Sequence, residues 1–477
     1  AETLYKSAAE AQKITYDYEL ANLYYYQRNY EKMTLKYLDL LHENPNYLNV
    51  VENRYQYIMT SSEDENYLEY LEINLLKRIQ KYSQKTVYLE LITWLFIQTG
   101  RYEEAFTQLI SLDKKSNTHG NLLIDFGIML NENSEYDLAL NSFDYVINLG
   151  ENKPNYHYAQ IQYLNTLYKK TISSSNHKQE ELLKLEQMLE DHLKKSSTKN
   201  SFLLTYALAN IKAFYLNKME DASDFLNSVI QEGKLTNNEL SECKLLYGDI
   251  LLFIDNPWDA SLIYAQVEKA NTNNPFGHEA KFRKAKLAYY TGQFEWAQAQ
   301  LNILKASTSQ LIANDAFELS FFINENSALD TSYNALSMFA RSDLLQFKHK
   351  HKEALQTLDS IIEQYSSHEI IDDVYYRKGD IYASLEEYDL AIEAYKKVAN
   401  TYSYDILADN ALYKLALLYD HVIKDKPKAM ETYKRLLTDY PSSIFVVETR
   451  KRFRFLRGET FQEERNIEED FFRNIYR

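Results

Sequence analysis

Residues that break helices and form tight turns are scarce in this sequence, whose 477 residues include only 10 Gly and 6 Pro. A sheet-rich or α/β protein of this length needs many tight turns, and Gly and Pro are among the residues that form them. The rest of the composition is 45% hydrophobic, with 42 Tyr and 22 Phe, which is ample material for a core. We therefore predict an all-α protein.

Cysteine and long apolar runs are also nearly absent. The single cysteine, Cys243, cannot form an internal disulfide, and its helical context predicts a small buried side chain. The most apolar stretch, residues 89–97, is far shorter than the roughly 20 residues that cross a bilayer, and it contains Glu90. We expect no direct transmembrane span. The chain begins at Ala1 rather than Met. Cleavage of a signal peptide and trimming of the expressed sequence both fit, and the small first residue favours the signal peptide.

Positive charge is in deficit, because 53 Lys and Arg face 69 Asp and Glu for a net charge of −16. Such a balance opposes binding to polyanions, so nucleic acid is not an expected partner. One dense basic run stands near the C-terminus: Arg450, Lys451, Arg452, Arg454 and Arg457. Two interpretations stay open for this run, a solubilising capping helix or a helix that docks on an acidic partner or a lipid headgroup.

Signatures of catalysis and of cofactor binding are missing. The patterns GxGxxG, GxxxxGK, GxSxG and HExxH do not occur. The one close pair of histidines, His349 and His351, is flanked by lysines that oppose a cation, so we expect a solvated turn rather than a metal site. We predict no catalytic residue, no cofactor, no metal and no small-molecule substrate.

The sequence does contain a short motif that recurs at a fixed period. Tyr102 precedes Ala105 by three positions, and the same pair returns 34 residues later as Tyr136 and Ala139. Three copies, at Ala139, Ala260 and Ala391, share a Gly twelve residues before the Ala and an aromatic residue four residues after it: Gly127 and Phe143, Gly248 and Tyr264, Gly379 and Tyr395. This period predicts pairs of antiparallel helices that cross closely at the small residues and stack on the neighbouring pairs.

This pattern resembles the tetratricopeptide repeat family, whose members place small and aromatic residues at fixed places in a 34-residue unit. Residues 372–403 carry the family's small and aromatic residues as Gly379, Tyr382, Tyr388, Ala391 and Tyr395, with Ser403 where Pro is usual. Residues 14–45 carry Ala21, Tyr24, Tyr30, Tyr37 and Pro45, with Met33 in place of the crossing Ala. The resemblance implies an α–α superhelix, a solenoid of about eleven helix pairs.

The spacing of the repeats divides the predicted array. Residues 1–309 are expected to form an N-terminal and central array, and 310–330 an irregular extra helix and linker that bends or interrupts the superhelix. Residues 331–457 are expected to form C-terminal repeats closed by a capping helix, whose apolar side chains cover the end of the core. Residues 458–477 read as a charged tail with apolar residues that dock on another protein.

The resemblance also implies where a partner binds, because the first helix of each pair lines the inner groove in this family. The residues at groove places are Tyr18, Asn22, Tyr25, Trp94, Asp249, Phe282, Tyr289, Asp343, Tyr376 and Asp380. This aromatic and acidic set favours a helix or extended segment that carries Lys or Arg. The alternative is that exposed Asp and Tyr residues only keep an unoccupied face soluble.

The predicted function is a non-enzymatic protein–protein interaction scaffold. The phrasing of "YSYDILADNALYKLALLYD" and of the basic run resembles exported tetratricopeptide proteins of Gram-negative cell envelopes. That resemblance implies a periplasmic or outer-membrane-associated subunit of a membrane-protein complex for outer-membrane biogenesis, secretion or gliding. The alternatives are a transient peptide-binding chaperone or regulatory adaptor, and a cytoplasmic location.

Overall fold

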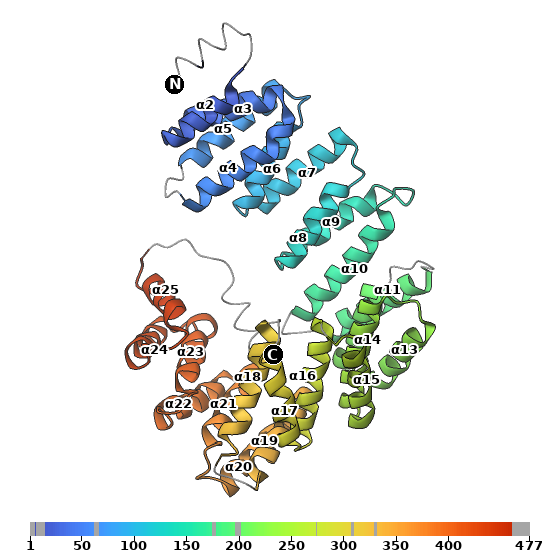
Figure 1. The fold of residues 1–477 in the computed structure, drawn as a ribbon, viewed down its shortest axis with the longest axis vertical. Helices are drawn as coiled ribbons and strands as arrows, with labels where there is room; N and C mark the ends of the chain where they lie inside the picture. Colours follow the sequence, from blue (N-terminus) through green and yellow to red (C-terminus); the bar gives the residue numbers. More distant parts are fainter. Residues whose placement is uncertain are drawn as a thin grey trace. The chain divides into compact units, whose positions relative to one another are not determined.

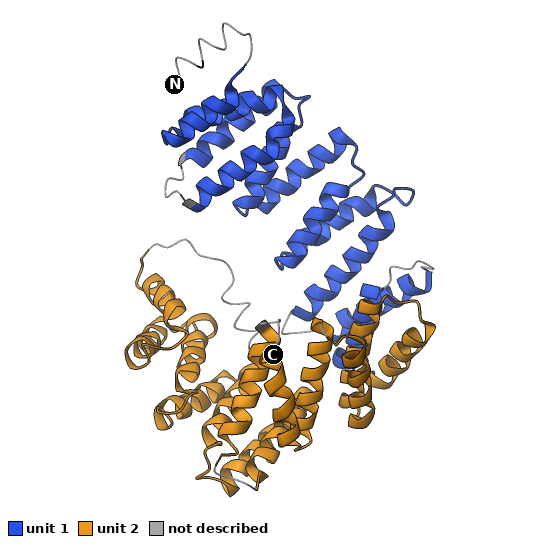
Figure 2. Cartoon of the chain, viewed as in Figure 1, with its two compact units in different colours: residues 1–218 blue, residues 219–477 orange. Residues whose placement is uncertain are grey.

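The computed structural model describes residues 5, 15–61, 66–173, 178–195, 202–272, 274–306, 310–328 and 332–459. Within these ranges every regular element is a helix (Figure 1), so the all-α prediction is confirmed. The chain divides into two compact units, residues 1–218 (unit 1) and residues 219–477 (unit 2) (Figure 2). The boundary between the two units, at residue 218, differs from the predicted boundaries at residues 309 and 331. The predicted boundaries were drawn from the spacing of the repeats, and they stay predictions.

Unit 1 contains α2 (Asp17–Tyr26), α3 (Tyr30–Glu43), the short 3₁₀ helix η1 (Pro45–Tyr47), α4 (Leu48–Ser61), α5 (Asn66–Lys81), α6 (Val87–Gln98), α7 (Tyr102–Ser116), α8 (Asn121–Glu132), α9 (Tyr136–Asn148), α10 (Tyr156–Ser173), α11 (Gln179–Lys195), α12 (Phe202–Asn210) and the π-helical turn η2 (Ile211–Tyr215).

Unit 2 contains α13 (Met219–Glu232), α14 (Asn237–Phe253), α15 (Pro257–Ala270), α16 (Pro275–Tyr290), α17 (Phe294–Leu304), α18 (Gln310–Glu325), α19 (Asn334–Phe347), α20 (His351–Gln364), α21 (Ile371–Ser384), α22 (Tyr388–Thr401), α23 (Ala408–Leu417), the π-helical turn η3 (Leu418–Val422), α24 (Lys426–Asp439) and α25 (Val446–Leu456).

Tight turns with one left-handed residue join the first helix of a pair to the second. In the α6–α7 and α16–α17 turns this residue is Gly100 (φ 69°) and Gly292 (φ 77°), each five residues before the crossing Ala. The same place in other pairs holds a larger residue, such as Ser134 (φ 63°) or Glu386 (φ 61°). The next backbone N–H then bonds back to the first helix, as from Glu387 to the Tyr382 carbonyl at 2.9 Å. The turn therefore fixes the antiparallel pair.

The helices of a pair cross where the sequence places its small residues. The crossing residue of each regular second helix is fully buried, whether it is Ala105, Ala391 or the Met33 that replaces Ala. A Cβ atom added to Gly379 would lie 2.5 Å from the Tyr395 ring, and one added to Gly248 would lie 2.4 Å from the Tyr264 ring. These glycines are required because the second helix places an aromatic ring directly against the backbone of the first.

The extra helix predicted at the irregular spacing is present as α18, which packs on α17. Beyond it, α19 packs on α16, so the first helices on the two sides of α18 remain in contact. A hydrogen bond from the Tyr289 hydroxyl in α16 to Asp343 in α19, at 2.8 Å, joins them directly. The insertion therefore does not break the row of first helices in unit 2.

Helix α25 closes the last core cluster, as predicted for a capping helix. Its Leu456 is buried there, and Val446 and Phe453 pack against the same cluster. Just before the helix, the Phe445 ring stacks on Tyr413 with ring centroids 4.3 Å apart. The predicted tail, apart from Gly458 and Glu459, lies outside the described residues.

Candidate partner-binding site

The residues predicted for the groove lie on first helices in both units, but they differ in exposure. Asp380 and Tyr289 are buried, whereas Tyr18, Tyr25 and Trp94 are half-buried. Two of the aromatic rings already make cation–π contacts with basic residues of this chain. Arg54 lies 4.1 Å from the centroid of the Tyr25 ring, and Lys414 lies 4.5 Å from the centroid of the Tyr376 ring. Phe282 is half-buried against the core of unit 2.

Asp380 shows how the acidic groove places are used within the chain. Its Oδ1 accepts hydrogen bonds from the Tyr395 hydroxyl and from Lys414 Nζ, both at 2.6 Å. Tyr395 lies in the second helix of the same pair, 15 residues on, and Lys414 in the first helix of the next pair, 34 residues on. Burial opposes the charge on Lys414, but Asp380 raises the pKa of this lysine to about 12. We call such a set of acceptor, tyrosine and cation a polar tie.

The same tie recurs along unit 2. Asp249 accepts a hydrogen bond from the Tyr264 hydroxyl at 2.6 Å and pairs with Arg283, again 15 and 34 residues further on. At the end of the unit, Asp420 accepts from the Tyr433 hydroxyl and from Arg452 Nη2, both at 3.2 Å. Here the separations are 13 and 32 residues, and Asp420 lies in the π-helical turn η3.

Two further ties differ in composition. In unit 1, Asn22 takes the acceptor place and binds the Tyr37 hydroxyl at 3.3 Å and Arg54 Nη2 at 2.9 Å. In unit 2, Asp343 binds the Tyr289 hydroxyl, and its Oδ1 lies 3.3 Å from Arg377 Nε. Since each cation comes from the following first helix, the ties join neighbouring pairs of the array.

The predicted contacts of Asn22, Asp249, Asp343 and Asp380 with a partner therefore stay predictions, and all four side chains have contacts inside the chain. Reversing the charge of Asp343 or Asp380 would place a lysine beside Arg377 or Lys414. Such variants would damage the fold before they reported on binding.

Acidic and aromatic side chains outside the ties gather on the first helices of unit 1. Burial raises the pKa of Glu52 in α4, and the nearby charge of Glu90 in α6 raises it further. Trp94 follows Glu90 by four residues in α6 and therefore lies on the same helix face. Tyr57 of α4 is 59% exposed, and its ring centroid lies 6.4 Å from that of Tyr25. The two carboxylates and the Trp94 ring can accept a cationic side chain.

A buried carboxyl in unit 2 has a strongly shifted ionisation. Asp372, in the first turn of α21, is 7% exposed. Burial raises the pKa of Asp372 to about 6, and the negative charges of Asp405 and Glu325 add to the rise. A raised carboxyl pKa means that the folded state holds the proton more tightly than the unfolded state. The stabilisation is therefore present at low pH and is lost as the pH rises through about 6.

We expect Asp372→Asn to raise the free energy of unfolding by about 1–2 kcal/mol at pH 7.5, because the amide removes the cost of a buried charge. At pH 4, where the native carboxyl is protonated when folded, we expect the gain to vanish. Urea unfolding at both pH values, followed by circular dichroism, measures the difference. Asp389→Asn is the matched control, since Asp389 occupies the first turn of α22 but is exposed. A gain that is equal at both pH values would contradict the assignment.

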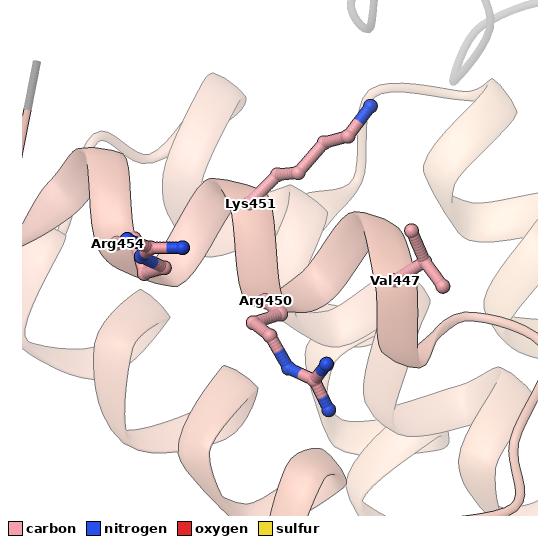
Figure 3. A pocket seen from close by; sticks show the side chains of 4 residues that line it. All are labelled: Val447, Arg450, Lys451 and Arg454. Carbon is pink, nitrogen blue, oxygen red and sulfur yellow. The ribbon is translucent and has the colours of Figure 1, made fainter. Parts of the chain in front are cut away.

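The basic run near the C-terminus separates into two faces on α25. Arg452 points inward, where it pairs with Asp420, whose side chain is only 3% exposed. The exposed residues Arg450, Lys451 and Arg454 line a hollow of about 140 Å³ together with Val447, and Figure 3 shows these side chains extending from the helix. Arg457 is exposed one turn further on. We call Val447, Arg450, Lys451, Arg454 and Arg457 the basic face, and Arg452 belongs to the core side instead.

Other candidate sites show no clear chemistry in the described part of the chain. Cys243 is buried, as predicted, and burial raises the pKa of its thiol to about 12. His349 is exposed in the predicted turn. No group of three His, Cys, Asp or Glu side chains among the described residues is arranged to hold a metal ion. Within the same ranges, no helix has both the length and the apolar character needed to cross a membrane.

The comparisons with known proteins identify the repeat. Residues 373–403 and 410–443, which cover most of α21 to α24, match the tetratricopeptide repeat family model. No curated protein sequence matches the chain.

Three solved structures have an architecture similar to that of this chain. A tetratricopeptide repeat protein from Parabacteroides merdae is 15% identical, with 58% of this chain and 91% of that one covered and a TM-score of 0.32. Rap protein complexed with competence and sporulation factor is 12% identical, with 75% and 98% covered and a TM-score of 0.38. The human IFIT1 dimer with m7Gppp-AAAA is 12% identical, with 87% and 95% covered and a TM-score of 0.32.

Proposed function

The chain belongs to the tetratricopeptide repeat family, and from this premise we propose that it is a non-enzymatic scaffold for protein–protein interaction. Repeats of this kind stack into arrays whose extended surfaces bind other proteins. The observation that carries the proposal is the helix pairing itself. The crossing geometry of the matched α21–α22 pair, Gly379 against Tyr395, returns at Gly127 with Phe143 and at Gly248 with Tyr264, far outside the matched residues.

The acidic and aromatic side chains of unit 1 support a partner segment that carries Lys or Arg. Glu52 and Glu90 are close enough to raise the pKa of Glu52, so a cationic side chain between them would relieve their repulsion. Trp94 follows Glu90 by four residues in α6 and adds a ring on the same side of that helix. The basic face of α25 offers the opposite charge at the other end of the sequence, which suits a scaffold that holds more than one partner.

We propose further that this scaffold is a subunit of a bacterial envelope assembly for outer-membrane biogenesis, secretion or gliding. The supporting observation is that the sequences of residues 402–420 and of the basic run resemble those of exported tetratricopeptide proteins. A periplasmic or outer-membrane-associated location and a membrane-protein complex as partner belong to this proposal.

We expect Glu52→Lys combined with Glu90→Lys to reduce partner capture at least about tenfold, because like charges would face the basic segment of the partner. The amount of protein that co-purifies with the tagged chain from its native source measures the effect. Glu43→Lys with Glu132→Lys is the matched control, since it makes the same charge change at exposed helix ends of unit 1. Equal capture by both double variants, with unchanged circular dichroism, would exclude this face as the binding site.

A further inference from the structure

Helix α18, the extra helix of unit 2, contacts three successive first helices. The centroid of its Phe322 ring lies 6.2 Å from that of Tyr289 in α16 and 4.9 Å from that of Phe339 in α19. Asn326 continues the last turn of α18 with a backbone hydrogen bond to the Phe322 carbonyl at 3.1 Å. Its side-chain Nδ2 donates a hydrogen bond to Asp373 Oδ2 of α21 at 3.0 Å. We call Tyr289, Phe339 and Asp373 the α18 seat.

The α18 seat lies on the helix faces that the sequence assigns to a partner. Tyr289 is itself a predicted groove residue. Phe339 precedes the predicted groove residue Asp343 by four residues, and Asp373 precedes Asp380 by seven, so each shares a helix face with that residue. Helix α18 therefore takes a place that the sequence predicts for a segment of another protein.

The row of first helices does not depend on α18 for its continuity. Helix α19 packs directly on α16, and the Tyr289 hydroxyl donates a hydrogen bond to Asp343 at 2.8 Å. The ion pair of Asp343 with Arg377 joins α19 to α21 in turn. Helix α18 can therefore leave its seat without breaking these contacts.

Two polar atoms on the buried side of α18 have no hydrogen-bond partner within the described part of the chain. They are the Ser320 hydroxyl oxygen and Asn326 Oδ1, and the two residues are 0% and 1% exposed. A buried polar atom without a partner opposes burial, because it has lost its hydrogen bonds to water. Release of α18 to solvent therefore costs less than the release of a helix whose polar atoms are all paired.

The Asp373 carboxyl is poorly matched by α18. Burial raises the pKa of Asp373 well above its ordinary value, and the negative charges of Asp372 and Glu325 raise it further. The hydrogen bond from Asn326 and the positive charge of Arg377 act in the opposite direction. Helix α18 thus offers this carboxyl a neutral amide and, in Glu325, a like charge. A Lys or Arg at the place of Asn326 would supply a charge-assisted hydrogen bond, which is stronger.

We propose that α18 is an internal ligand of unit 2, and that a partner helix with an aromatic residue and a Lys or Arg four residues further on displaces it from the α18 seat. The aromatic residue takes the place of Phe322 against the rings of Tyr289 and Phe339, and the cation takes the place of Asn326 at Asp373. This inference goes beyond the proposed scaffold function, because it assigns a second binding place, in unit 2, which the chain itself keeps closed. Its test needs only the purified chain and peptides, so its failure is distinct from a failure of partner capture.

Synthetic peptides of residues 310–326, labelled with fluorescein, serve as the partner helix, and fluorescence anisotropy measures their binding to the full chain. We expect the peptide with Asn326→Lys to bind about tenfold more tightly than the peptide of native sequence, because its cation reaches Asp373. The peptide with Asn324→Lys is the matched control, since it makes the same charge change at an exposed place of α18. Asp373→Asn in the chain should remove the advantage of the Asn326→Lys peptide.

Variants of the chain test the displacement itself. Asn326→Asp places a second carboxylate beside Asp373, so the chain's own α18 should leave its seat more often and the peptides should bind about tenfold more tightly. Asn324→Asp makes the same charge change at an exposed place and should leave binding unchanged. Hydrogen exchange, read by mass spectrometry, should become faster in the chain's own α18 when the Asn326→Lys peptide is bound, while α16 stays protected.

The comparison of peptides on the native chain does not depend on the folding of any variant. Equal affinity of the Asn326→Lys and Asn324→Lys peptides would overturn the proposal. Persistence of their difference in the Asp373→Asn chain, or unchanged exchange of α18 in the presence of bound peptide, would place the peptide elsewhere and contradict the α18 seat. Absence of binding to an Asn326→Asp chain that keeps its helices by circular dichroism would contradict it as well.

Discussion

Replacing Asp380 with Ala is expected to lower the free energy of unfolding of the α21–α24 region by about 3–5 kcal/mol. The carboxylate binds the Tyr395 hydroxyl and Lys414 in a polar tie, and its own side chain is 12% exposed. Its removal leaves a buried ammonium group and a buried hydroxyl without their acceptor. Uncompensated buried charges of this kind are among the most destabilising changes in proteins.

Hydrogen exchange in α22 and α23, together with the urea midpoint of the whole chain, measures the loss. Asp380→Asn should cost less, because the amide oxygen still accepts a hydrogen bond although the charge is gone. Glu393→Ala in α22 is the control for the loss of an exposed carboxylate. If Asp380→Ala costs no more than Glu393→Ala, the polar ties do not hold neighbouring helix pairs together.

Replacing Ala391 with Leu is expected to cost about 1–3 kcal/mol through overpacking. Ala391 is fully buried in α22, where this helix crosses α21. The added side chain has no room, since the Tyr395 ring already lies against the backbone of Gly379. The two helices would have to separate or the ring would have to leave its place.

Urea unfolding followed by circular dichroism measures this cost. Glu393→Leu is the matched control, because it makes the same side chain at an exposed place of the same helix. A neutral Ala391→Leu variant would contradict the assignment of the crossing point.

The helix pairs themselves were predictable because their signal is local and periodic. A small residue at a crossing point and a ring sixteen residues further on are dictated by the contact between two helices of one pair, so they repeat with the pair. The left-handed residue in the turn between the two helices of a pair was recognisable from the sequence only where it is glycine, at Gly100 and Gly292. Elsewhere Ser134 and Glu386 adopt the same conformation, which their residue types do not signal.

The polar ties were not predicted, although their residues recur at fixed intervals in the sequence. The sequence places Asp380 toward the groove, but its partners lie 15 and 34 residues further on, in two other helices. A search for a Tyr and a cation at those two intervals would have found the ties of Asp249 and Asp380. The tie of Asp420 would have escaped it, because both of its intervals are two residues shorter.

The orientation of the basic run depends on the same register. Composition alone treats Arg452 and Arg454 alike, whereas the structure directs Arg452 to Asp420 and leaves Arg454 exposed. The difference follows from the alignment of α25 with α23, in which Arg452 takes the place of Lys414.

The most direct test of the scaffold function is purification of the tagged chain from its native source in mild detergent, with cross-linking and mass spectrometry. We expect a fixed set of proteins in constant proportion, cross-linked through the first helices of unit 1 or through α25. Recovery of the chain alone, or of many different proteins in small and exchangeable amounts, would contradict a constitutive scaffold. The second result would favour a transient peptide-binding role instead.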